Sequence, residues 1–341
     1  MTDSTPPLPQ AIASSWHRFL DVYEPLRPEL YRYCRHLTRT PWDAEDLVQD
    51  AMARAFATLG CIIDSPPNPR AWLFRVASNL WIDQQRRRRE SPGAVSEFSE
   101  APEPRAPREA MGTLLSQLSP QERAAVVLKD AFDLSLEETA EALSTTVGAI
   151  KAALHRGRGK LVQAPEPSEG PPMTARRLDA FCEAFNARDI DRLAAMLLET
   201  ATVEVVGAST GYGREVGRQR VLPGMLFGSK LLAELSALCG VELRYRHGAH
   251  PTLPRGEVRL HRGEPILLSW YAHDDGEAVR AVTRLVFDES GLVSHLRNYF
   301  YTPEILTEVC RELDVPFRIN GYFSMKSCGP TARCELPDEV T

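Results

Sequence analysis

Apolar positions recur at helical spacing through the stretch Asn68–Arg89. The positions at i, i+3, i+4 and i+7 that predict one buried face are Leu73, Val76, Ala77 and Leu80. Asn68 is a suitable N-cap and Pro69 suits the first helical position, so we expect a helix of about 20 residues. A second stripe with the same spacing contains Trp72, Arg75, Asn79, Asp83 and Arg86. Its groups can bind phosphates and base edges, although Trp72 could equally belong to the core.

The preceding stretch, Trp42–Leu59, also has a helical pattern. Asp43 is the expected N-cap. The positions expected to face inward are Leu47, Val48, Ala51 and Ala55. An acidic outer surface is then predicted, made of Glu45, Asp46, Gln49 and Asp50. Trp16–Thr40 reads as one or two helices with a break near Pro25 and Pro28.

The stretch Met111–Gln163 contains two capping-box patterns that predict helix starts: Ser119 with Glu122, and Ser135 with Glu138. Thr145 or Thr146 is then expected to cap a basic helix, Val147–Val162. Two short helices, a turn and a basic second helix are typical of a helix-turn-helix.

From Thr174 the pattern changes to helices followed by strands. The expected strands are Thr202–Val206, Val241–His247, Ile266–His273, Val279–Phe287 and Val293–Tyr301. A hairpin turn is predicted at Asp288–Gly291, and a mobile loop at Gly207–Gly217. A helix is expected at Glu304–Leu313. The segments Ser91–Ala110 and Ala164–Met173 are rich in Pro, Glu and Ser and read as linkers.

Composition limits the functions that fit. The 341 residues allow two to three domains. The net charge of −6 argues against a protein that coats nucleic acid with a surface that is basic throughout. Positive charge is instead concentrated in Arg70–Arg89 and Lys151–Lys160. The N-terminal residues predict no signal peptide, no window is apolar enough to span a membrane, and seven scattered cysteines indicate reduced thiols, so we expect a cytoplasmic chain. No metal site or cofactor is predicted.

The segments Asp43–Asp50, Asn68–Leu73 and Asn79–Asp83 resemble region 2 of bacterial sigma factors of the extracytoplasmic-function (ECF) type. The match covers roughly Phe19–Glu90. Positions from Glu138 to Arg158 resemble sigma region 4, with two departures. Ser144 stands where the family usually has Gly, and Ala152 and Ala153 stand where a Ser-Arg pair is common.

The resemblance implies three binding surfaces. The residues implied in docking on the β′ clamp of core RNA polymerase are Asp43, Glu45, Asp46, Gln49 and Asp50. Those implied in contacting and melting the minus-ten element of promoter DNA are Arg70, Trp72, Arg75, Asn79, Asp83, Arg86 and Arg87. Those implied in reading the minus-35 element are Thr146, Lys151, His155, Arg156 and Arg158. The β flap of the polymerase is a further implied partner.

The sequence Phe185–Leu193 resembles the opening of the SnoaL-like branch of the NTF2-like fold. This implies an α+β cone with a largely apolar cavity, which could bind a small ligand or simply pack. Five histidines and the pair Asp274 and Asp275 are available, but no spacing demands a proton-transfer dyad, so catalytic residues are not expected. Cys328 and Cys334 lack the further ligands that a metal site would need.

The predicted chain is multidomain: all-α sigma region 2 and helix-turn-helix region 4, followed by an α+β NTF2-like cone domain. The predicted ranges are 15–90 for region 2, 91–110 for a linker, 111–163 for region 4, 164–173 for a linker, 174–303 for the cone and 304–341 for an extension. The predicted function is that of a non-enzymatic sigma factor whose C-terminal domain modulates activity. The alternatives are a DNA-binding regulator that never joins polymerase, and an enzyme that uses the cone cavity.

Overall fold

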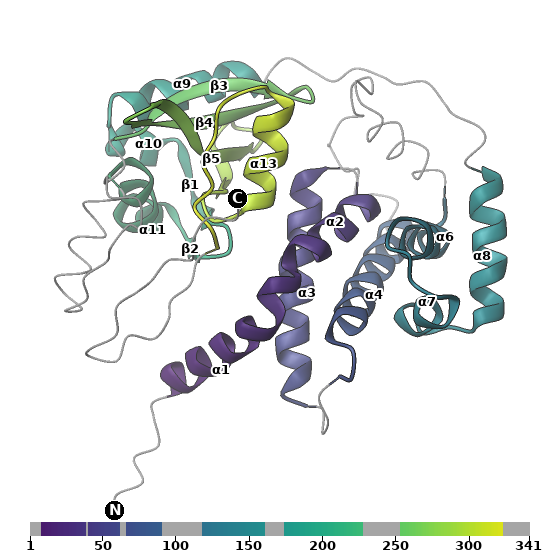
Figure 1. The fold of residues 1–341 in the computed structure, drawn as a ribbon. Coiled ribbons are helices and arrows are strands. Elements are labelled where there is room, and N and C mark those ends of the chain that lie inside the picture. Colours follow the sequence, from purple (N-terminus) through teal and green to yellow (C-terminus); the bar gives the residue numbers. More distant parts are fainter. Residues whose placement is uncertain are drawn as a thin grey trace, which may run out of the picture. The chain divides into compact units, whose positions relative to one another are not determined.

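The computed structural model describes residues 8–38, 40–61, 66–90, 118–160, 174–227 and 253–322. The chain forms two compact units, Met1–Glu169 and Gly170–Thr341. We call them the helical unit and the sheet unit, and Figure 1 shows the elements of each. The predicted linkers, the expected strand at Val241–His247, and Cys328 and Cys334 lie outside the described residues.

The first half of the helical unit is described as a set of packed helices. They are α1 (Leu8–Tyr23), α2 (Arg27–Leu37), α3 (Pro41–Leu59) and α4 (Pro69–Glu90). The 3-10 turn η1 (Glu24–Leu26) lies at the break predicted from the two prolines. Tyr33, Trp42 and Phe74 are among its largest fully buried side chains, so aromatic rings dominate this core.

The N-cap predicted for α3 was wrong by three residues. Thr40 caps the helix, because its Oγ1 accepts a hydrogen bond from the Asp43 N–H at 3.0 Å. Pro41 suits the first helical position, which moves Asp43 into the first turn. The cap predicted for α4 is confirmed, since the Ala71 N–H donates to Asn68 Oδ1 at 3.0 Å.

The second half of the helical unit contains the helix-turn-helix pattern. Its elements are α6 (Pro120–Val126), the π-helical turn η2 (Val127–Ala131), α7 (Leu136–Ala142) and α8 (Val147–Lys160). Both predicted capping boxes are present, one at Ser119 and Glu122 and the other at Ser135 and Glu138. These caps fix where α6 and α7 begin.

The two halves of the helical unit contact each other through Phe132 and Arg123. The Phe132 ring lies 5.7 Å from the Tyr33 ring and 5.4 Å from the Phe74 ring, edge-on to both. Arg123 donates to the Leu37 carbonyl at the end of α2 at 2.8 Å and lies over the Trp81 ring. A cation at a helix C-terminus is favourable because carbonyls there lack intrahelical partners.

The sheet unit contains a six-stranded mixed sheet in the order β2-β1-β6-β5-β4-β3. The strands are β1 (Leu197–Val205), β2 (Ser209–Tyr212), β3 (Arg255–His261), β4 (Glu264–His273), β5 (Gly276–Phe287) and β6 (Val293–Asn298). β1 and β6 are parallel, and the other neighbouring pairs are antiparallel. The described helical elements are α9 (Thr174–Asn186), α10 (Ile190–Ala195), α11 (Arg214–Val216), η3 (Gly217–Val221) and α13 (Pro303–Glu312).

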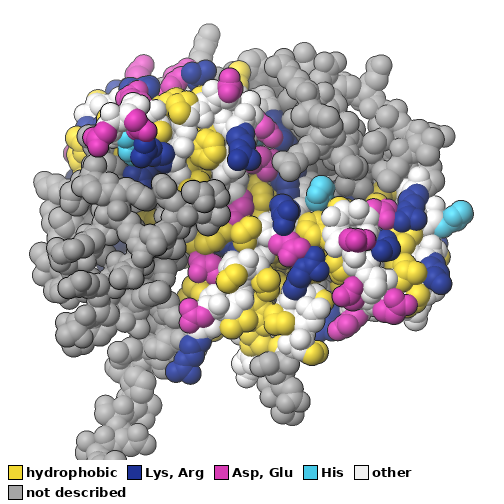
Figure 2. Space-filling view, viewed as in Figure 1, with side chains coloured by type: hydrophobic (Ala, Val, Ile, Leu, Met, Phe, Trp, Pro, Cys, Tyr) yellow, Lys and Arg dark blue, Asp and Glu magenta, His cyan; other side chains and the backbone are white. Residues whose placement is uncertain are grey.

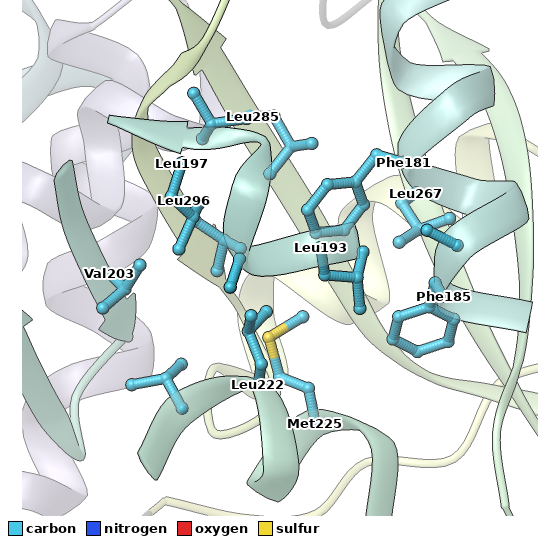
Figure 3. Packing of buried hydrophobic residues seen from close by; sticks show 14 of the residues in the cluster. Phe181, Phe185, Leu193, Leu197, Val203, Leu222, Met225, Leu267, Leu285 and Leu296 are labelled. Carbon is cyan, nitrogen blue, oxygen red and sulfur yellow. The ribbon is translucent and has the colours of Figure 1, made fainter. Parts of the chain in front are cut away.

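Hydrophobic side chains fill the space between the sheet and the helices on one of its faces. Phe181 and Phe185 of α9 and Leu193 of α10 point toward side chains of the strands, among them Leu267 and Leu296 (Figure 3). All of these side chains are fully buried. The predicted α+β class is therefore confirmed for this part of the chain.

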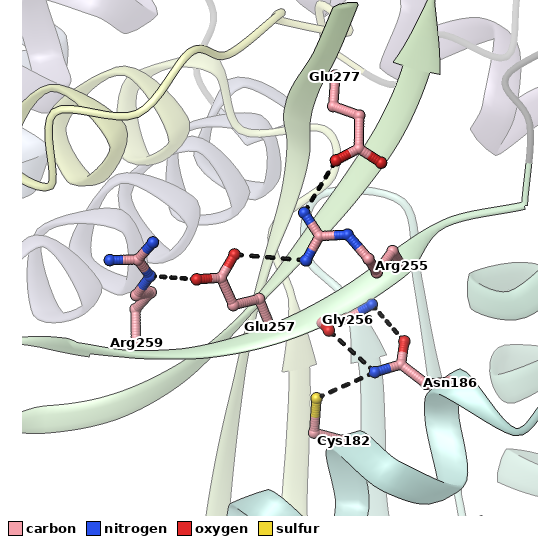
Figure 4. A network of polar contacts seen from close by, with 7 residues as sticks. All are labelled: Cys182, Asn186, Arg255, Gly256, Glu257, Arg259 and Glu277. Carbon is pink, nitrogen blue, oxygen red and sulfur yellow. Dashed lines mark hydrogen bonds and ion pairs between the residues drawn. The ribbon is translucent and has the colours of Figure 1, made fainter.

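Asn186, within the SnoaL-like segment, fastens the end of α9 to the edge strand β3 (Figure 4). Its Oδ1 accepts from the Gly256 N–H at 2.7 Å, and its Nδ2 donates to the Gly256 carbonyl at 3.0 Å. Gly256 has to be glycine here, because a Cβ would lie 2.9 Å from Phe185 Cδ1. Among the described strands β3 has no neighbour on this side, and the Asn186 amide forms hydrogen bonds with its backbone there.

One expectation for the sheet unit was wrong and one strand was missed. Gly207–Gly217 was expected to be a mobile loop, but it contains β2 and α11. β3 was not predicted, although Arg255, Glu257 and Arg259 alternate with Gly256, Val258 and Leu260 at strand spacing. The hairpin between β5 and β6 is confirmed, with the Asp288 N–H donating to the Leu292 carbonyl at 2.8 Å.

Candidate nucleic-acid interface

The acidic surface of α3 keeps most of its predicted members. Asp43 and Asp50 are exposed, and Asp46 and Gln49 are half-buried. Gln84 of α4 donates to Asp50 at 3.4 Å, which ties the surface to the neighbouring helix. These four side chains form an exposed polar patch that could receive a partner.

Glu45 does not belong to that patch, which corrects the sequence prediction. Its side chain is fully buried and forms an ion pair with Arg27, which is itself buried. Gln49 Nε2 also donates to Glu45 Oε1 at 3.1 Å. A buried carboxylate is stable only when it is paired and hydrogen-bonded, so Glu45 holds α3 against α2.

An exposed stripe follows α4 from its middle to its end. Its members are Arg75, which is half-buried, and Asn79, Asp83, Arg86 and Arg87, which are exposed. Their spacing of three to four residues places them on one helix face. This face combines an amide, a carboxylate and guanidinium groups, the groups that bind base edges and phosphates.

Arg70 and Trp72 are placed differently from the prediction. Arg70 makes two hydrogen bonds to the carboxylate of Glu29, at 2.9 Å and 2.5 Å, and lies over the Phe74 ring. The hydrogen bond from Arg70 lowers the pKa of Glu29. Trp72 is 7% exposed and contacts the Tyr23 ring at 5.7 Å, so it belongs to the core. Trp72 is therefore enclosed in the core, and the guanidinium of Arg70 is occupied by Glu29 in this structure.

The turn between α7 and α8 has the geometry of a Schellman motif. The Thr145 N–H donates to the Ala140 carbonyl at 2.9 Å, and the Ser144 N–H to the Glu141 carbonyl at 3.1 Å. Ser144 has a φ of 50°, in the left-handed region. Thr146 is then the N-cap of α8, because the Ala149 N–H donates to its Oγ1 at 3.2 Å.

Replacing Ser144 by glycine is expected to stabilise the helical unit by about 0.5–1 kcal/mol, because glycine adopts positive φ without steric cost. The free energy of unfolding from denaturant titration measures this. Ala152→Gly, at an exposed position in the interior of α8, is the matched control and should cost about 1 kcal/mol. A loss of stability in Ser144→Gly would show that the serine side chain itself holds the turn.

The basic side chains of α8 fall into two groups. Lys151 and His155, one helical turn apart, are exposed and have no ion pair in the described structure. Arg156 instead pairs with Glu122 at 3.0 Å, and Arg158 with Asp130 at 2.5 Å. Ala153, where an arginine is common in the resembling family, is 2% exposed, so that position faces the core.

Glu122 is the carboxylate around which the end of α8 is arranged. Burial alone would raise its pKa, but hydrogen bonds from Lys160, the Ser119 N–H and Arg156 outweigh this and hold the pKa at about 2. The Glu122 carboxylate therefore stays ionised at neutral and mildly acidic pH.

The histidines described in the sheet unit do not form a cluster, and His261 and His295 contact different carboxylates. His261 is buried and contacts Glu312 at 2.7 Å, and His295 lies 3.6 Å from Glu204. Burial would raise the pKa of Glu312, but hydrogen bonds from His261 and Arg262 lower it to about 2. His247 and His250 lie outside the described residues. Within the described ranges no cluster of three or more His, Cys, Asp or Glu could hold a metal ion, and no helix has the length and apolar character needed to cross a membrane.

Two protein-family models match the helical unit. Residues 22–91 match the model of sigma-70 region 2, and residues 108–161 match that of sigma-70 region 4. The first model covers the last residues of α1 and all of α2, α3 and α4, and the second covers α6 to α8. The order of the two matches is the order predicted from the sequence.

Several curated proteins are similar to this chain. The RNA polymerase sigma-E factor of Streptomyces coelicolor is 33% identical over 171 residues, covering 49% of this chain and 90% of that protein. The ECF RNA polymerase sigma factor SigG of Mycobacterium tuberculosis is 28% identical over 225 residues, covering 53% of this chain and 60% of SigG. SigJ of the same species is 33% identical over 193 residues, covering 51% of this chain. The chain spans 61% of the length of SigJ.

Solved structures with a similar fold give low TM-scores. The crystal structure of Mycobacterium tuberculosis SigJ has a TM-score of 0.31 at 22% identity, covering 82% of this chain and 95% of that one. The sigma factor RpoE of Bartonella quintana, solved with the anti-sigma factor NepR, has a TM-score of 0.37 at 29% identity, covering 42% of this chain and 94% of that one. At these scores the structural likenesses add nothing to the argument.

Proposed function

Because this chain belongs to the ECF RNA polymerase sigma factor family, we propose that it binds core RNA polymerase, directs it to specific promoters and helps to initiate transcription. The observation that supports this best is the pairing, in one unit, of an exposed polar and basic stripe on α4 with a helix-turn-helix whose second helix is basic. The chain needs no covalent chemistry of its own, because the polymerase forms the phosphodiester bonds.

We assign polymerase docking to the polar patch on α3, formed by Asp43, Asp46, Gln49 and Asp50. Because the polymerase surface would have to be basic to complement it, association should weaken as salt rises. Glu45 contributes to this patch indirectly, because its ion pair with Arg27 holds α3 against α2.

The minus-ten element is assigned to the stripe Arg75, Asn79, Asp83, Arg86 and Arg87 on α4. Duplex opening extrudes and unpairs bases at a cost of a few kcal/mol, which phosphate and base-edge contacts can offset. Arg70 and Trp72 are left out, since one is paired with Glu29 and the other is buried. The minus-35 element is assigned to Thr146, Lys151 and His155, at the start and on the exposed face of α8.

The ranges 15–90 and 111–163 are proposed as the two promoter-binding domains, with 91–110 and 164–173 as linkers. The proposed role of the sheet unit (cone 174–303, extension 304–341) is to modulate their activity. Its hydrophobic core is formed by residues of the sheet unit, and these residues lie outside both family matches.

Run-off transcription tests the proposal. Core polymerase with the full chain should transcribe from a promoter fragment selected from a random library, and core polymerase alone should not. A chain that ends at Glu169 should give a different amount of transcript, because it lacks the modulating unit. Failure of the purified chain to form a complex with core polymerase would leave the DNA-binding regulator as the better assignment. Equal transcript from both lengths would remove the modulating role.

A further inference from the structure

The end of the recognition helix α8 is held to α6 by one carboxylate. Arg156 Nε donates to Glu122 Oε1 at 3.0 Å, and Lys160 Nζ donates to Glu122 Oε2 at 2.7 Å. The same carboxylate also accepts from the Ser119 N–H at 3.0 Å. The Glu122 side chain is only 5% exposed. It therefore forms ion pairs with two successive turns of α8 at a site that is largely shielded from solvent.

Gly157, between those two cations, lets the helices approach closely. A Cβ at this position would lie 2.9 Å from Val126 Cγ2 and 3.6 Å from Glu122 Cβ. On the other side of α8, the guanidinium of Arg158 is held by Asp130 of η2 through two hydrogen bonds, at 3.0 Å and 2.5 Å. Ion pairs on both sides of α8 therefore fix its rotation about its own axis.

That rotation decides which residues face outward. The positions that face the core are Ile150, Ala153, Leu154 and Gly157. The exposed positions on the opposite face are Gly148, Lys151, Ala152 and His155. Where the helical unit is in view in Figure 2, basic and acidic side chains are interspersed with apolar ones and form no continuous basic field.

We propose that Glu122 is a positioning residue for minus-35 recognition: it engages Arg156 and Lys160, fixes the rotation of α8, and leaves Lys151 and His155 to meet the DNA. The inference rests on the proposed function, because it refines how the same helix would be used. A cation engaged by a buried carboxylate releases no counterion when DNA binds, whereas an exposed lysine that meets a phosphate does.

The dependence of DNA binding on salt separates the two kinds of cation. The full chain, in complex with core polymerase, is titrated with a selected promoter fragment at several salt concentrations. Lys151→Met should reduce the slope of log K against log[salt] by about 0.9, the value for one phosphate contact. Lys160→Met, which removes the same charge from the same helix, should leave the slope unchanged. Equal losses of slope in both variants would overturn the inference.

Removing the carboxylate tests the positioning role directly. Glu122→Gln releases Arg156 and Lys160, so the slope should steepen by up to about 1.8 and discrimination against a plain duplex should fall. Glu137→Gln, an exposed carboxylate on α7 with no ion pair in the described structure, is the matched control for lost negative charge. A Glu122→Gln slope equal to that of Glu137→Gln would also contradict the inference.

Failure of the proposed function would give a different result. If no complex with core polymerase forms, that function is lost, but the slopes of the chain alone on a plain duplex still compare Lys151→Met with Lys160→Met. If Glu122→Gln does not fold, the two lysine variants decide the question, because Lys160 is about half exposed and its loss leaves Arg156 on the carboxylate.

Discussion

Replacing Arg27 by methionine is expected to lower the free energy of unfolding of the helical unit by about 3–5 kcal/mol. The change leaves Glu45 buried without the cation that compensates its charge, at a site where the carboxylate is fully enclosed. Such a loss is a large part of the total stability of a typical domain. Urea denaturation followed by circular dichroism measures it.

Two further variants show whether the buried pair is the cause. Arg32→Met removes an exposed arginine from the same helix and should change the stability by no more than about 0.5 kcal/mol. Arg27→Met combined with Glu45→Met replaces both charges by apolar groups and should recover most of the loss. If the free energy of unfolding of Arg27→Met lies within about 0.5 kcal/mol of that of the original chain, the change behaves like a surface substitution. Water would then have access to Glu45, and the ion pair would not be fully desolvated.

The Arg86→Ala/Arg87→Ala variant is expected to bind core polymerase normally and to lose about 100-fold in promoter opening. Each contact of a guanidinium with a base edge or phosphate contributes about 1–3 kcal/mol, so two contacts account for this factor. Both side chains are exposed at the end of the α4 stripe, on a different helix from the docking patch of α3. Permanganate reactivity of unpaired thymines measures the open complex.

The control for this experiment is Arg32→Ala, an exposed arginine on α2 outside the three proposed surfaces. It should open promoters as the original chain does. If Arg86→Ala/Arg87→Ala also opens promoters fully, the arginines at the end of α4 do not participate in melting, and the assignment of this stripe is wrong. Weakened binding to core polymerase would instead show that docking extends onto α4.

Local signals in the sequence were sufficient to place several helix starts of the helical unit. Asn68, Ser119 and Ser135 each mark a helix start, because a side-chain oxygen there satisfies a backbone N–H that lacks a partner. The break near Pro25 follows equally from the missing N–H of proline. These interactions join residues at most four apart, so the sequence shows both partners together.

Long-range pairing explains what the sequence did not predict. Arg70 meets Glu29 across 41 positions, and Arg156 meets Glu122 across 34, so no local pattern shows that these cations are occupied. Glu45 had a readable signal: it falls in the buried stripe of α3 with Trp42 and Val48, at helical spacing. A carboxylate is rarely fully buried, which favoured an outward position for Glu45 over this signal.

In the sheet unit, the strands rich in apolar residues were predicted and the edge strands were missed. β4, β5 and β6 lie inside the sheet and are mostly buried, so their patterns are strong. β2 and β3 are its two edges. β2 is four residues long and contains no aliphatic side chain, so its pattern is weak. β3 alternates charged residues with Gly256, Val258 and Leu260, so its sequence carried a strand signal that the prediction did not use.

The contact of Phe132 with Tyr33 and Phe74 makes the two family-matched segments share one aromatic core. Pulling the helix-turn-helix away from α2 and α4 would expose these rings to water and lose edge-to-face pairs of about 0.5–1.5 kcal/mol each. Heating should therefore melt both segments in a single transition, so that a destabilising change in α2, α3 or α4 also lowers the melting temperature of α6, α7 and α8.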